Sequence, residues 1–404
     1  MSTPTAWSER PALLAPPRTP PAGADVVVVG GGLAGCAVAA LLAEEGVDVA
    51  LIERRADLGL GGSARTAGLC LPGLADAPSR LVEALGEDVG RALFEATVEN
   101  LDLLEAHGLM ERCGALFCAA SPLEEEELAA SLALLEAWDH PVDAWTAAEV
   151  EERAGLRGWG SGRFDPRGGR TQPRAAIGAL AQRAAEAGAA LCPGLEVIAA
   201  SDEGDHRVLH LVDLADPGAP LRRLRASLVV WAGDHRLGLV EPFFLDKLHP
   251  VRLQQQLRRA APGLVAPRLP VTAQFSYAWA GPDGAGGLLS GGCRWATPHL
   301  EVMESDEEIS VPVVDQKIQA VVAARFGAWG ARPPDLRWST IATFTCDGLP
   351  IVGPLPGRPT EQALCGWNGR PWSWAMLAAT DVAERLLRGG PSRLPRQLHP
   401  SRFL

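Results

Sequence analysis

Three glycines and one carboxylate near the start of the chain have the types and spacing needed to hold a dinucleotide. Gly30, Gly32 and Gly35 form the pattern G-x-G-x-x-G directly after a run of valines. In such a pattern the first glycine permits a tight turn, the second lets backbone approach a pyrophosphate, and the third allows a helix to pack closely on a strand. Glu53 follows at the spacing of an acidic residue that accepts hydrogen bonds from a ribose. These four residues predict a bound dinucleotide, and they fit FAD and NAD equally well.

The hydrophobic pattern around these residues predicts the strands and the helix that must position them. Residues 25–29 predict a buried strand, 36–46 an Ala/Leu-rich helix, and 47–55 a second strand with Glu53 at its end. A strand, a glycine turn, a helix and a second strand form the βαβ unit on which a pyrophosphate lies at the helix N-terminus. The negative charge of Glu53 disfavours a 2′-phosphate, and therefore NADP.

The segment 54–73 is rich in glycine, serine and arginine and has no hydrophobic period. A loop of this kind places backbone N–H groups and a guanidinium against something flat or anionic. A flexible surface loop is the alternative, and the pattern leaves it open.

Bulk composition narrows the class of protein. The 404 residues exceed the size of a single core, so we expect two domains, and the net charge of −12 argues against a nucleic-acid or anionic-membrane partner. No apolar run reaches the roughly 18 residues that span a bilayer. The eight cysteines lack C-x-x-C spacing, which favours reduced, mostly buried thiols in a cytoplasmic protein. The histidines are dispersed, so no metal site is predicted.

Six motifs occur in an order that is typical of one enzyme family. They are GGSARTAG (61–68), LVVWAGDH (228–235), HPVRLQQQ (249–256), LLSGGCRW (288–295), CDGLPIVGP (346–354) and GWNGRPW (366–372). With the N-terminal glycines, this set resembles the FAD-dependent oxidoreductases related to D-amino-acid oxidase, glycine oxidase and sarcosine oxidase, which share the DAO-type fold.

The resemblance implies an α/β fold, with a Rossmann-like FAD-binding domain and an inserted antiparallel-sheet substrate domain. It divides the chain into a Pro-rich N-terminal arm that we expect to be disordered and not a signal peptide (1–23), a discontinuous FAD domain (24–90, 160–235 and 340–395), a substrate domain (91–159 and 236–339) and a C-terminal tail (396–404).

The resemblance also implies which residues contact FAD. They are Gly30, Gly32, Leu33, Ala34, Gly35, Glu53, Arg54, Gly62, Ser63, Ala64, Arg65, Thr66, Val197, Ala232, Gly233, Gly366, Asn368, Gly369, Arg370 and Trp372. A helix beginning near Trp372 would direct its positive end at the flavin, and Pro371, which has no N–H, would remove one hydrogen bond. Cys346 does not match the family position for covalent attachment, so we expect non-covalent FAD.

The implied reaction is oxidation of a C–N bond in a small amine or amino-acid-like substrate, by hydride transfer to flavin N5. The arginine or lysine that anchors the substrate carboxylate in relatives is absent, because Ala342 and Ser373 lie near those places. Arg370 and Arg294 are the candidate substitutes, with Tyr277 on the predicted strand 271–280, where Phe275, Tyr277 and Trp279 would share one face. These aromatic residues line either the substrate site or an ordinary sheet core.

Two other functions remain open from the sequence. The first is a flavoenzyme of the same fold that acts on a bulky, apolar or protein-bound substrate in a biosynthetic pathway, which the tryptophans around residue 370 favour. The second is a flavin-binding scaffold without catalysis. The sequence does not identify the substrate, the oligomeric state, or whether O2 or another acceptor reoxidises the flavin.

Overall fold

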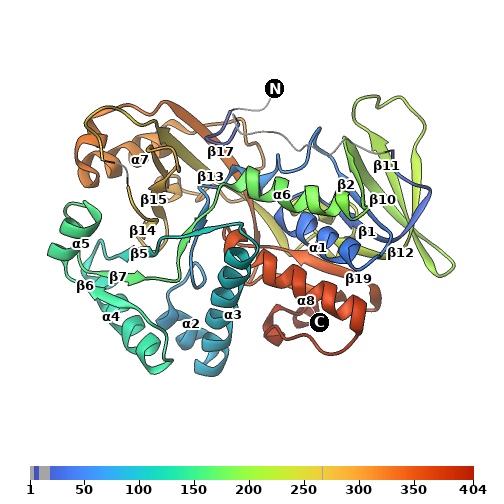
Figure 1. The fold of residues 1–404 in the computed structure, drawn as a ribbon, viewed down its shortest axis with the longest axis horizontal. Helices are drawn as coiled ribbons and strands as arrows, with labels where there is room; N and C mark the ends of the chain where they lie inside the picture. The colour runs from blue at the N-terminus through green and yellow to red at the C-terminus, as the bar shows by residue number, and fades with distance from the viewer. Residues whose placement is uncertain (1–3, 9–18, 266) are drawn as a thin grey trace. The chain divides into compact units, whose positions relative to one another are not determined.

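The computed structural model describes residues 4–8, 19–265 and 267–404, which form two compact units. Unit 1 comprises Met1–Glu9, Arg65–Gln172 and Val251–Ile341, and unit 2 comprises Arg10–Ala64, Pro173–Pro250 and Ala342–Leu404. Both units are discontinuous in sequence (Figure 1). Their bounds differ from the predicted ones chiefly at residues 65–90, which belong to unit 1; the division into an FAD domain and a substrate domain remains a prediction.

Unit 2 is built on a mainly parallel sheet. Its strands are β1 (Gly23–Val29), β2 (Val49–Glu53), β9 (Ala190–Pro193), β10 (Leu195–Glu203), β11 (His206–Asp213), β12 (Arg222–Trp231), β18 (Ile351–Leu355) and β19 (Arg358–Cys365). The order is β10-β11-β12-β1-β2-β9, with β19 parallel to β12 and β18 antiparallel to β19. The valine run forms β1 in the centre of this sheet, where side chains are buried on both faces.

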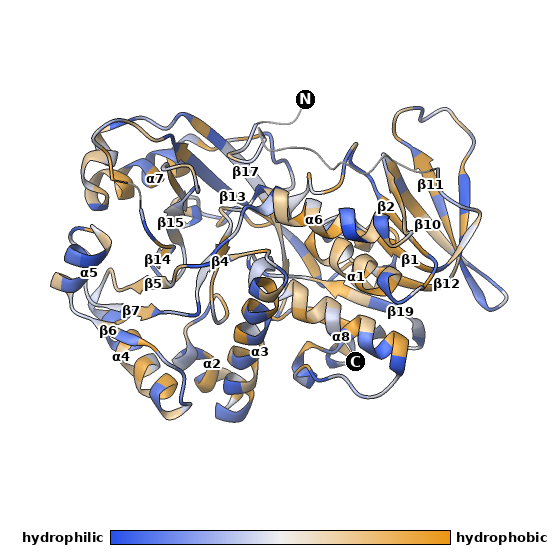
Figure 2. Ribbon diagram, viewed as in Figure 1, coloured by the Kyte–Doolittle hydropathy of each residue, from blue (hydrophilic) through white to orange (hydrophobic). Residues whose placement is uncertain are grey.

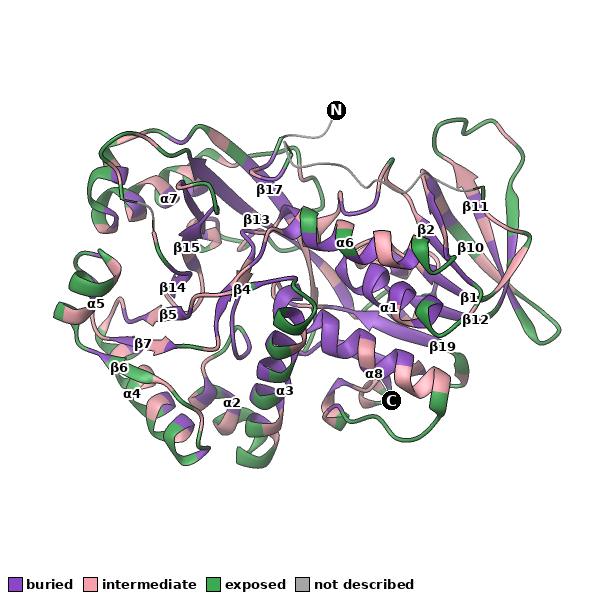
Figure 3. Ribbon diagram, in the orientation of Figure 1, coloured by how far each residue is buried: buried purple, intermediate pink, exposed green. Residues whose placement is uncertain are grey.

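Three helices cover the sheet of unit 2. Helix α1 (Leu33–Glu44) packs against both α6 (Pro173–Glu186) and α8 (Ala375–Arg388) and lies between them in Figure 1. Figure 3 shows α1 almost entirely buried, because its alanines and leucines contact helices as well as the sheet. The predicted βαβ unit is therefore present, with its helix beginning three residues earlier than expected.

Unit 1 is built on a mainly antiparallel sheet with the order β17-β13-β16-β15-β14-β5-β7-β6, in which β14 runs parallel to β5. These strands are β5 (Ala115–Cys118), β6 (Asp143–Trp145), β7 (Gly162–Asp165), β13 (Leu248–Arg258), β14 (Val271–Ala273), β15 (Ala278–Pro282), β16 (Leu288–Gly292) and β17 (Leu336–Thr345). A small sheet contains β3 (Leu69–Cys70), β4 (Glu111–Arg112) and β8 (Gly169–Arg170).

The helices of unit 1 are α2 (Pro78–Leu85), α3 (Glu87–Ala106), α4 (Pro122–Ala137), α5 (Ala147–Ala154) and α7 (Pro312–Arg325). Hydrophilic residues along α3 and α4 coincide with exposed surface (Figures 2 and 3). Ser121 caps α4 by accepting a hydrogen bond from the Glu124 amide. The acidic first turn of α4 is not wholly solvated, however, because the Glu124 side chain is buried.

The predicted continuous strand 271–280 is wrong. Gln274, Phe275 and Ser276 have φ values of 54°, 52° and 64°, so the chain turns back and β14 pairs with β15. Glutamine, phenylalanine and serine carry no turn signal of the kind that glycine or asparagine would give. The turn is stabilised instead by distant partners: the Phe275 amide donates to Glu124 and the Ser276 hydroxyl donates to the Ala75 carbonyl.

The prediction of a disordered N-terminal arm is wrong for residues 4–8, whereas residues 1–3 and 9–18 lie outside the described residues. Trp7 is 1% exposed, packs with Leu257, Leu289 and Trp338 of unit 1, and donates its indole N–H to the Thr66 carbonyl at 2.8 Å. The predicted arm, residues 1–23, also ends one residue too late, because β1 already begins at Gly23.

The eight cysteines are free thiols, six of them buried, in agreement with the sequence.

Candidate cofactor and substrate sites

The β1–α1 turn of unit 2 is a cradle of bare backbone. Gly30 has a φ of +115°, and a Cβ there would lie 2.6 Å from the carbonyl oxygen of Ala232. A Cβ at Gly35 would overlap the carbonyl oxygen of Gly30. Gly32 precedes α1, and no described side chain caps this helix N-terminus. The amides that open α1 thus fit a pyrophosphate, and Leu33 and Ala34 belong to this first turn.

Glu53 ends β2 and faces the same turn. Its two carboxylate oxygens accept hydrogen bonds from the Gly31 and Arg55 amides, both at 2.7 Å. Burial raises the pKa of Glu53, and the two amide hydrogen bonds oppose that rise. The role of its remaining lone pairs as acceptors for ribose hydroxyls stays a prediction. Arg54, the next residue, is only partly buried.

Three further predicted segments lie in unit 2. Ala232 and Gly233 follow β12, and the Ala232 amide donates to the Val29 carbonyl, which brings this backbone beside the Gly30 turn. The Ser63 hydroxyl lies 3.3 Å from where a Cβ of Gly32 would be. Val197 is buried in β10 next to a register shift. Contact of these residues with a nucleotide stays a prediction.

The predicted flavin loop spans both units. Gly62–Arg65 forms a 3-10 turn, of which Gly62, Ser63 and Ala64 belong to unit 2, whereas Arg65 and Thr66 belong to unit 1. Arg65 is buried; its Nε donates to the Ser339 carbonyl and lies 3.6 Å from Glu307. The loop is therefore held by specific contacts, which disfavours the alternative of a flexible surface loop.

The C-terminal turn of unit 2 is organised by Asn368. This residue has a φ of 51°; its Oδ1 accepts from the Thr345 amide and its Nδ2 donates to the Gly366 carbonyl. Asn368 and the flanking Gly369 thus shape the turn. Trp372 lies in a 3-10 turn (Pro371–Ser373), so α8 begins at Ala375, three residues later than predicted.

Of the predicted catalytic residues, the structure brings two together in unit 1. The Arg294 guanidinium lies 4.7 Å from the centre of the Tyr277 ring, and its Nη2 lies 3.4 Å from the Tyr277 hydroxyl. Burial lowers the pKa of Arg294. Arg370 belongs to unit 2, where its amide donates to the Trp367 carbonyl. Tyr277 occupies the β14–β15 turn and not a strand, which corrects its predicted position.

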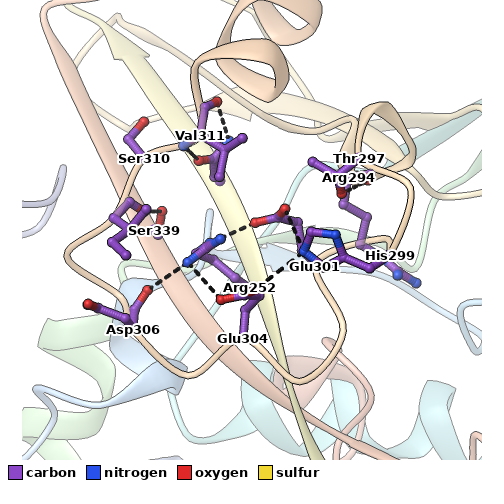
Figure 4. A network of polar contacts seen from close by, with 12 residues as sticks. Arg252, Arg294, Thr297, His299, Glu301, Glu304, Asp306, Ser310, Val311 and Ser339 are labelled. Carbon is purple, nitrogen blue, oxygen red and sulfur yellow. Dashed lines mark hydrogen bonds and ion pairs between the residues drawn. The ribbon is translucent and has the colours of Figure 1, made fainter.

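A charged network that the sequence did not reveal holds the segment that follows Arg294 (Figure 4). Arg252 donates to Glu301 at 2.7 Å; both side chains are buried, and Glu304 lies 3.4 Å from the same guanidinium. The Leu300 carbonyl in turn accepts from Arg294 at 2.8 Å. Arg252 belongs to the P-V-R motif. Its partners, Glu301 and Glu304, lie about 50 residues later in the sequence and are not part of any recognised motif.

The described part of the chain holds no group of three or more histidine, cysteine, aspartate or glutamate side chains arranged for a metal ion. None of its helices is both long enough and apolar enough to cross a bilayer.

Comparison with known proteins decides the family. The model of the DAO family, described as FAD dependent oxidoreductase, matches residues 25–385. The chain belongs to this family. DAO-family members are FAD-dependent oxidoreductases, so the cradle at Gly30, Gly32 and Gly35 belongs to an FAD-dependent protein.

Solved structures of DAO-type enzymes share the fold. Glycine oxidase from Geobacillus kaustophilus is 22% identical with a TM-score of 0.77, covering 95% of this chain and all of that one. L-proline dehydrogenase from P. horikoshii is 19% identical with a TM-score of 0.79, covering 95% and 98%. The predicted α/β fold with an antiparallel substrate-domain sheet is thereby confirmed.

Curated relatives include a longer protein. The tRNA 5-methylaminomethyl-2-thiouridine biosynthesis bifunctional protein MnmC of Paracidovorax citrulli is 27% identical over 425 residues, which cover 99% of this DAO-family chain and 63% of that protein. The Pseudomonas putida protein of the same name is also 27% identical, with 98% and 61% covered. The chain thus spans less than two thirds of the length of these relatives.

Proposed function

We propose that this DAO-family protein oxidises a C–N bond of an amine or amino-acid-like substrate. The observation that carries the proposal is the β1–α1 cradle, where only glycine fits at positions 30 and 35 and Glu53 faces the turn. Bound FAD would accept a hydride, that is two electrons and the hydrogen, from the carbon bearing the amine, and water would then hydrolyse the imine.

The chain's own residues would bind and orient the substrate. Arg294, partly buried against Tyr277, is the proposed anchor for a negatively charged or polar substrate group in unit 1. Its carbonyl partner Leu300 belongs to the segment that Arg252 holds through Glu301, so this pair positions Arg294. Arg370, which belongs to unit 2, is the alternative proposed anchor.

A tRNA-linked or otherwise bulky amine is the second candidate substrate. The MnmC relatives are named for tRNA 5-methylaminomethyl-2-thiouridine biosynthesis, which favours a substrate larger than a free amino acid. The net charge of −12 argues against RNA binding, because a polyanion needs a basic surface. We therefore place a small amine first.

Anaerobic bleaching of the flavin tests the proposal. The holoenzyme is mixed with amines, N-methyl amino acids, D- and L-amino acids, and an aminomethyluridine-containing tRNA, and absorbance near 450 nm is followed. Bleaching by a small amine, with peroxide after air is readmitted, supports an oxidase; bleaching by the tRNA alone supports the second candidate. If no member bleaches the flavin, the proposal fails and a non-catalytic scaffold is favoured.

A further inference from the structure

Unit 1 contains a cavity of about 70 Å³ that the proposed function does not use. Its wall includes exposed Arg80 and extends inwards to buried Arg163 and Thr272, so the cavity connects surface to interior. A water molecule needs roughly 10–15 Å³ of such space, so several waters or one small organic ion fit.

Arg163 is the unusual group in this wall. Its residue is 3% exposed, and its Nε is buried without a hydrogen-bond partner. No ion pair or hydrogen bond is made by its side chain among the described residues; the guanidinium instead stacks over the Phe117 ring at 3.9 Å. Stacking covers one face of the guanidinium and leaves the N–H donors at its edge available.

The two glutamates of the cavity wall are engaged with other groups, and the third acid of the wall, Asp76, is exposed to solvent. Glu124 accepts hydrogen bonds from the Ala120 amide, the Ser121 hydroxyl and the Phe275 amide. Glu127 pairs with Arg80. These carboxylates therefore do not neutralise Arg163.

Behind the cavity, Asp165 lies two residues along the same strand as Arg163. It accepts from the Arg167 amide and pairs with His140 at 3.1 Å. Burial lowers the pKa of Arg163 to about 10, so the guanidinium stays charged at neutral pH. The charge of nearby Asp165 opposes this lowering of the pKa, but Asp165 makes no hydrogen bond to the guanidinium among the described residues. A buried N–H donor without an acceptor is costly unless a ligand supplies one.

One wall of the cavity is formed by backbone in an unfavourable conformation. The 274–276 turn, with three successive residues at positive φ, supplies Phe275 and Ser276 to the wall. Non-glycine residues in this conformation are disfavoured. The hydrogen bonds to Glu124 and Ala75 hold the turn in place, so the wall is a fixed feature of unit 1.

We propose that this cavity binds a small monocarboxylate, whose two oxygens pair with the edge of the Arg163 guanidinium. The planar fork of arginine matches a carboxylate. A phosphate dianion fits poorly, because the wall already carries the carboxylates of Asp76, Glu124 and Glu127. The cavity size limits the ligand to about the size of acetate or propionate.

Titration calorimetry of the FAD-loaded protein with sodium acetate, against sodium chloride at equal ionic strength, tests the site. Acetate should bind saturably, and Arg163→Met should weaken binding at least about tenfold. Arg163→Lys should bind more weakly than wild type and more tightly than Arg163→Met. Arg167→Met is the matched control, since Arg167 lies in the same unit outside the cavity wall and should leave acetate binding unchanged.

Thermal unfolding guards against a misfolded variant. Removing an uncompensated buried charge should leave the Tm of Arg163→Met equal to or above that of wild type without acetate. Acetate should raise the Tm of wild type and not that of Arg163→Met. The proposal is overturned if wild type shows no saturable acetate binding, if phosphate binds equally well, or if Arg163→Met retains the acetate affinity.

The carboxylate has two sources, the substrate itself or a separate small acid. Arg163→Met would raise KM for carboxylated amines only in the first case and leave their kinetics unchanged in the second. Acetate binding needs no turnover, so this site can be confirmed even if the proposed oxidation fails.

Discussion

At the scale of single residues, the cofactor cradle depends on the absence of side chains. Gly35 lies in the first turns of α1, directly against the backbone of Gly30. A methyl group at Gly35 would overlap the Gly30 carbonyl oxygen, and a backbone oxygen cannot rotate away as a side chain can. Glycine is required here for space, whereas at Gly30 it is required for both space and a φ of +115°.

Gly35→Ala should therefore weaken FAD binding and lower the free energy of unfolding by about 3 kcal/mol, the upper part of the range for overpacking. FAD affinity can be measured by fluorescence quenching and stability by urea denaturation. Gly218→Ala is the control, because Gly218 is exposed, lies outside the predicted cofactor segments, and a Cβ there would meet the Asp216 side chain at an ordinary 3.7 Å. Equal effects of the two substitutions would contradict this account.

A second prediction at the residue scale concerns the order in which the cysteines are alkylated. Cys346 is the exposed cysteine, and Cys113 is half-buried, with a pKa that burial raises to about 11. Because the thiolate is the reactive form, iodoacetamide at neutral pH should label Cys346 first and Cys113 far more slowly. Mass spectrometry of native protein should find this order; labelling of the six buried cysteines without denaturant would be inconsistent with the core described above.

A third prediction at the residue scale is that FAD is bound without a covalent link. Thr340 lies near the family's attachment position, and the neighbouring thiol, Cys346, does not match it. Acid precipitation should release the flavin into the supernatant as intact FAD. A yellow pellet after washing would show a covalent link and contradict the prediction.

At the scale of elements, short helices and turns decide details that periodicity does not reveal. The D-G-x-P motif is an example, because Asp347 is tied to the last 3-10 helix, Pro400–Phe403. Arg402 donates to both Asp347 oxygens, at 2.6 and 3.1 Å, and to the Leu349 carbonyl at 2.8 Å. The end of the chain thus anchors the motif within unit 2.

This anchor predicts a pH-dependent stability. Burial raises the pKa of Asp347, but the hydrogen bond and charge of Arg402 outweigh it, and the net pKa lies below the ordinary value. A lowered folded-state pKa contributes stability that is present above the unfolded pKa, about 4, and is lost as pH falls through the folded pKa. Arg402→Met should cost about 1 kcal/mol at pH 7 and less below pH 4.

Urea denaturation from pH 3 to pH 7 would measure the difference between Arg402→Met and wild type. Arg396→Met, an exposed arginine in the preceding 3-10 helix, is the control and should change little. A difference that grows towards acidic pH would have the wrong sign for this ion pair.

At the scale of the whole molecule, each unit draws on segments far apart in sequence. Trp7 joins unit 1 although the next residues of that unit begin at Arg65. Its indole packs with Leu257, Leu289 and Trp338, so the first described residues of the chain complete a core formed by strands some 250 to 330 positions later.

Trp7→Ala should consequently destabilise unit 1 by about 3–5 kcal/mol, as for other buried aromatic residues. Urea denaturation followed by hydrogen exchange would show the loss in unit 1. Trp295→Ala provides the comparison, since Trp295 is 42% exposed and its loss should cost well under that amount. Equal stability of Trp7→Ala and wild type would mean that residues 4–8 do not contribute to the core.

The cradle was predictable from sequence because its parts are local. Gly30, Gly35 and Glu53 lie within 24 positions, and each has a backbone or charge requirement that few other residues satisfy. The β14–β15 turn was not predictable, because Phe275 and Ser276 alternate as a strand would. The residues that hold them in a turn include Glu124 and Ala75, which are distant in sequence.

The sequence by itself determined the family, the dinucleotide cradle and the two-sheet fold, since these follow from short-range patterns and ordered motifs. Only the tertiary structure decided that Arg294 stacks on Tyr277, that Arg252 holds the Glu301 segment, and that Arg163 lies buried without an acid partner. The physical reason is that a charge is defined by its neighbours in space, and here those neighbours come from strands and loops that only folding brings together.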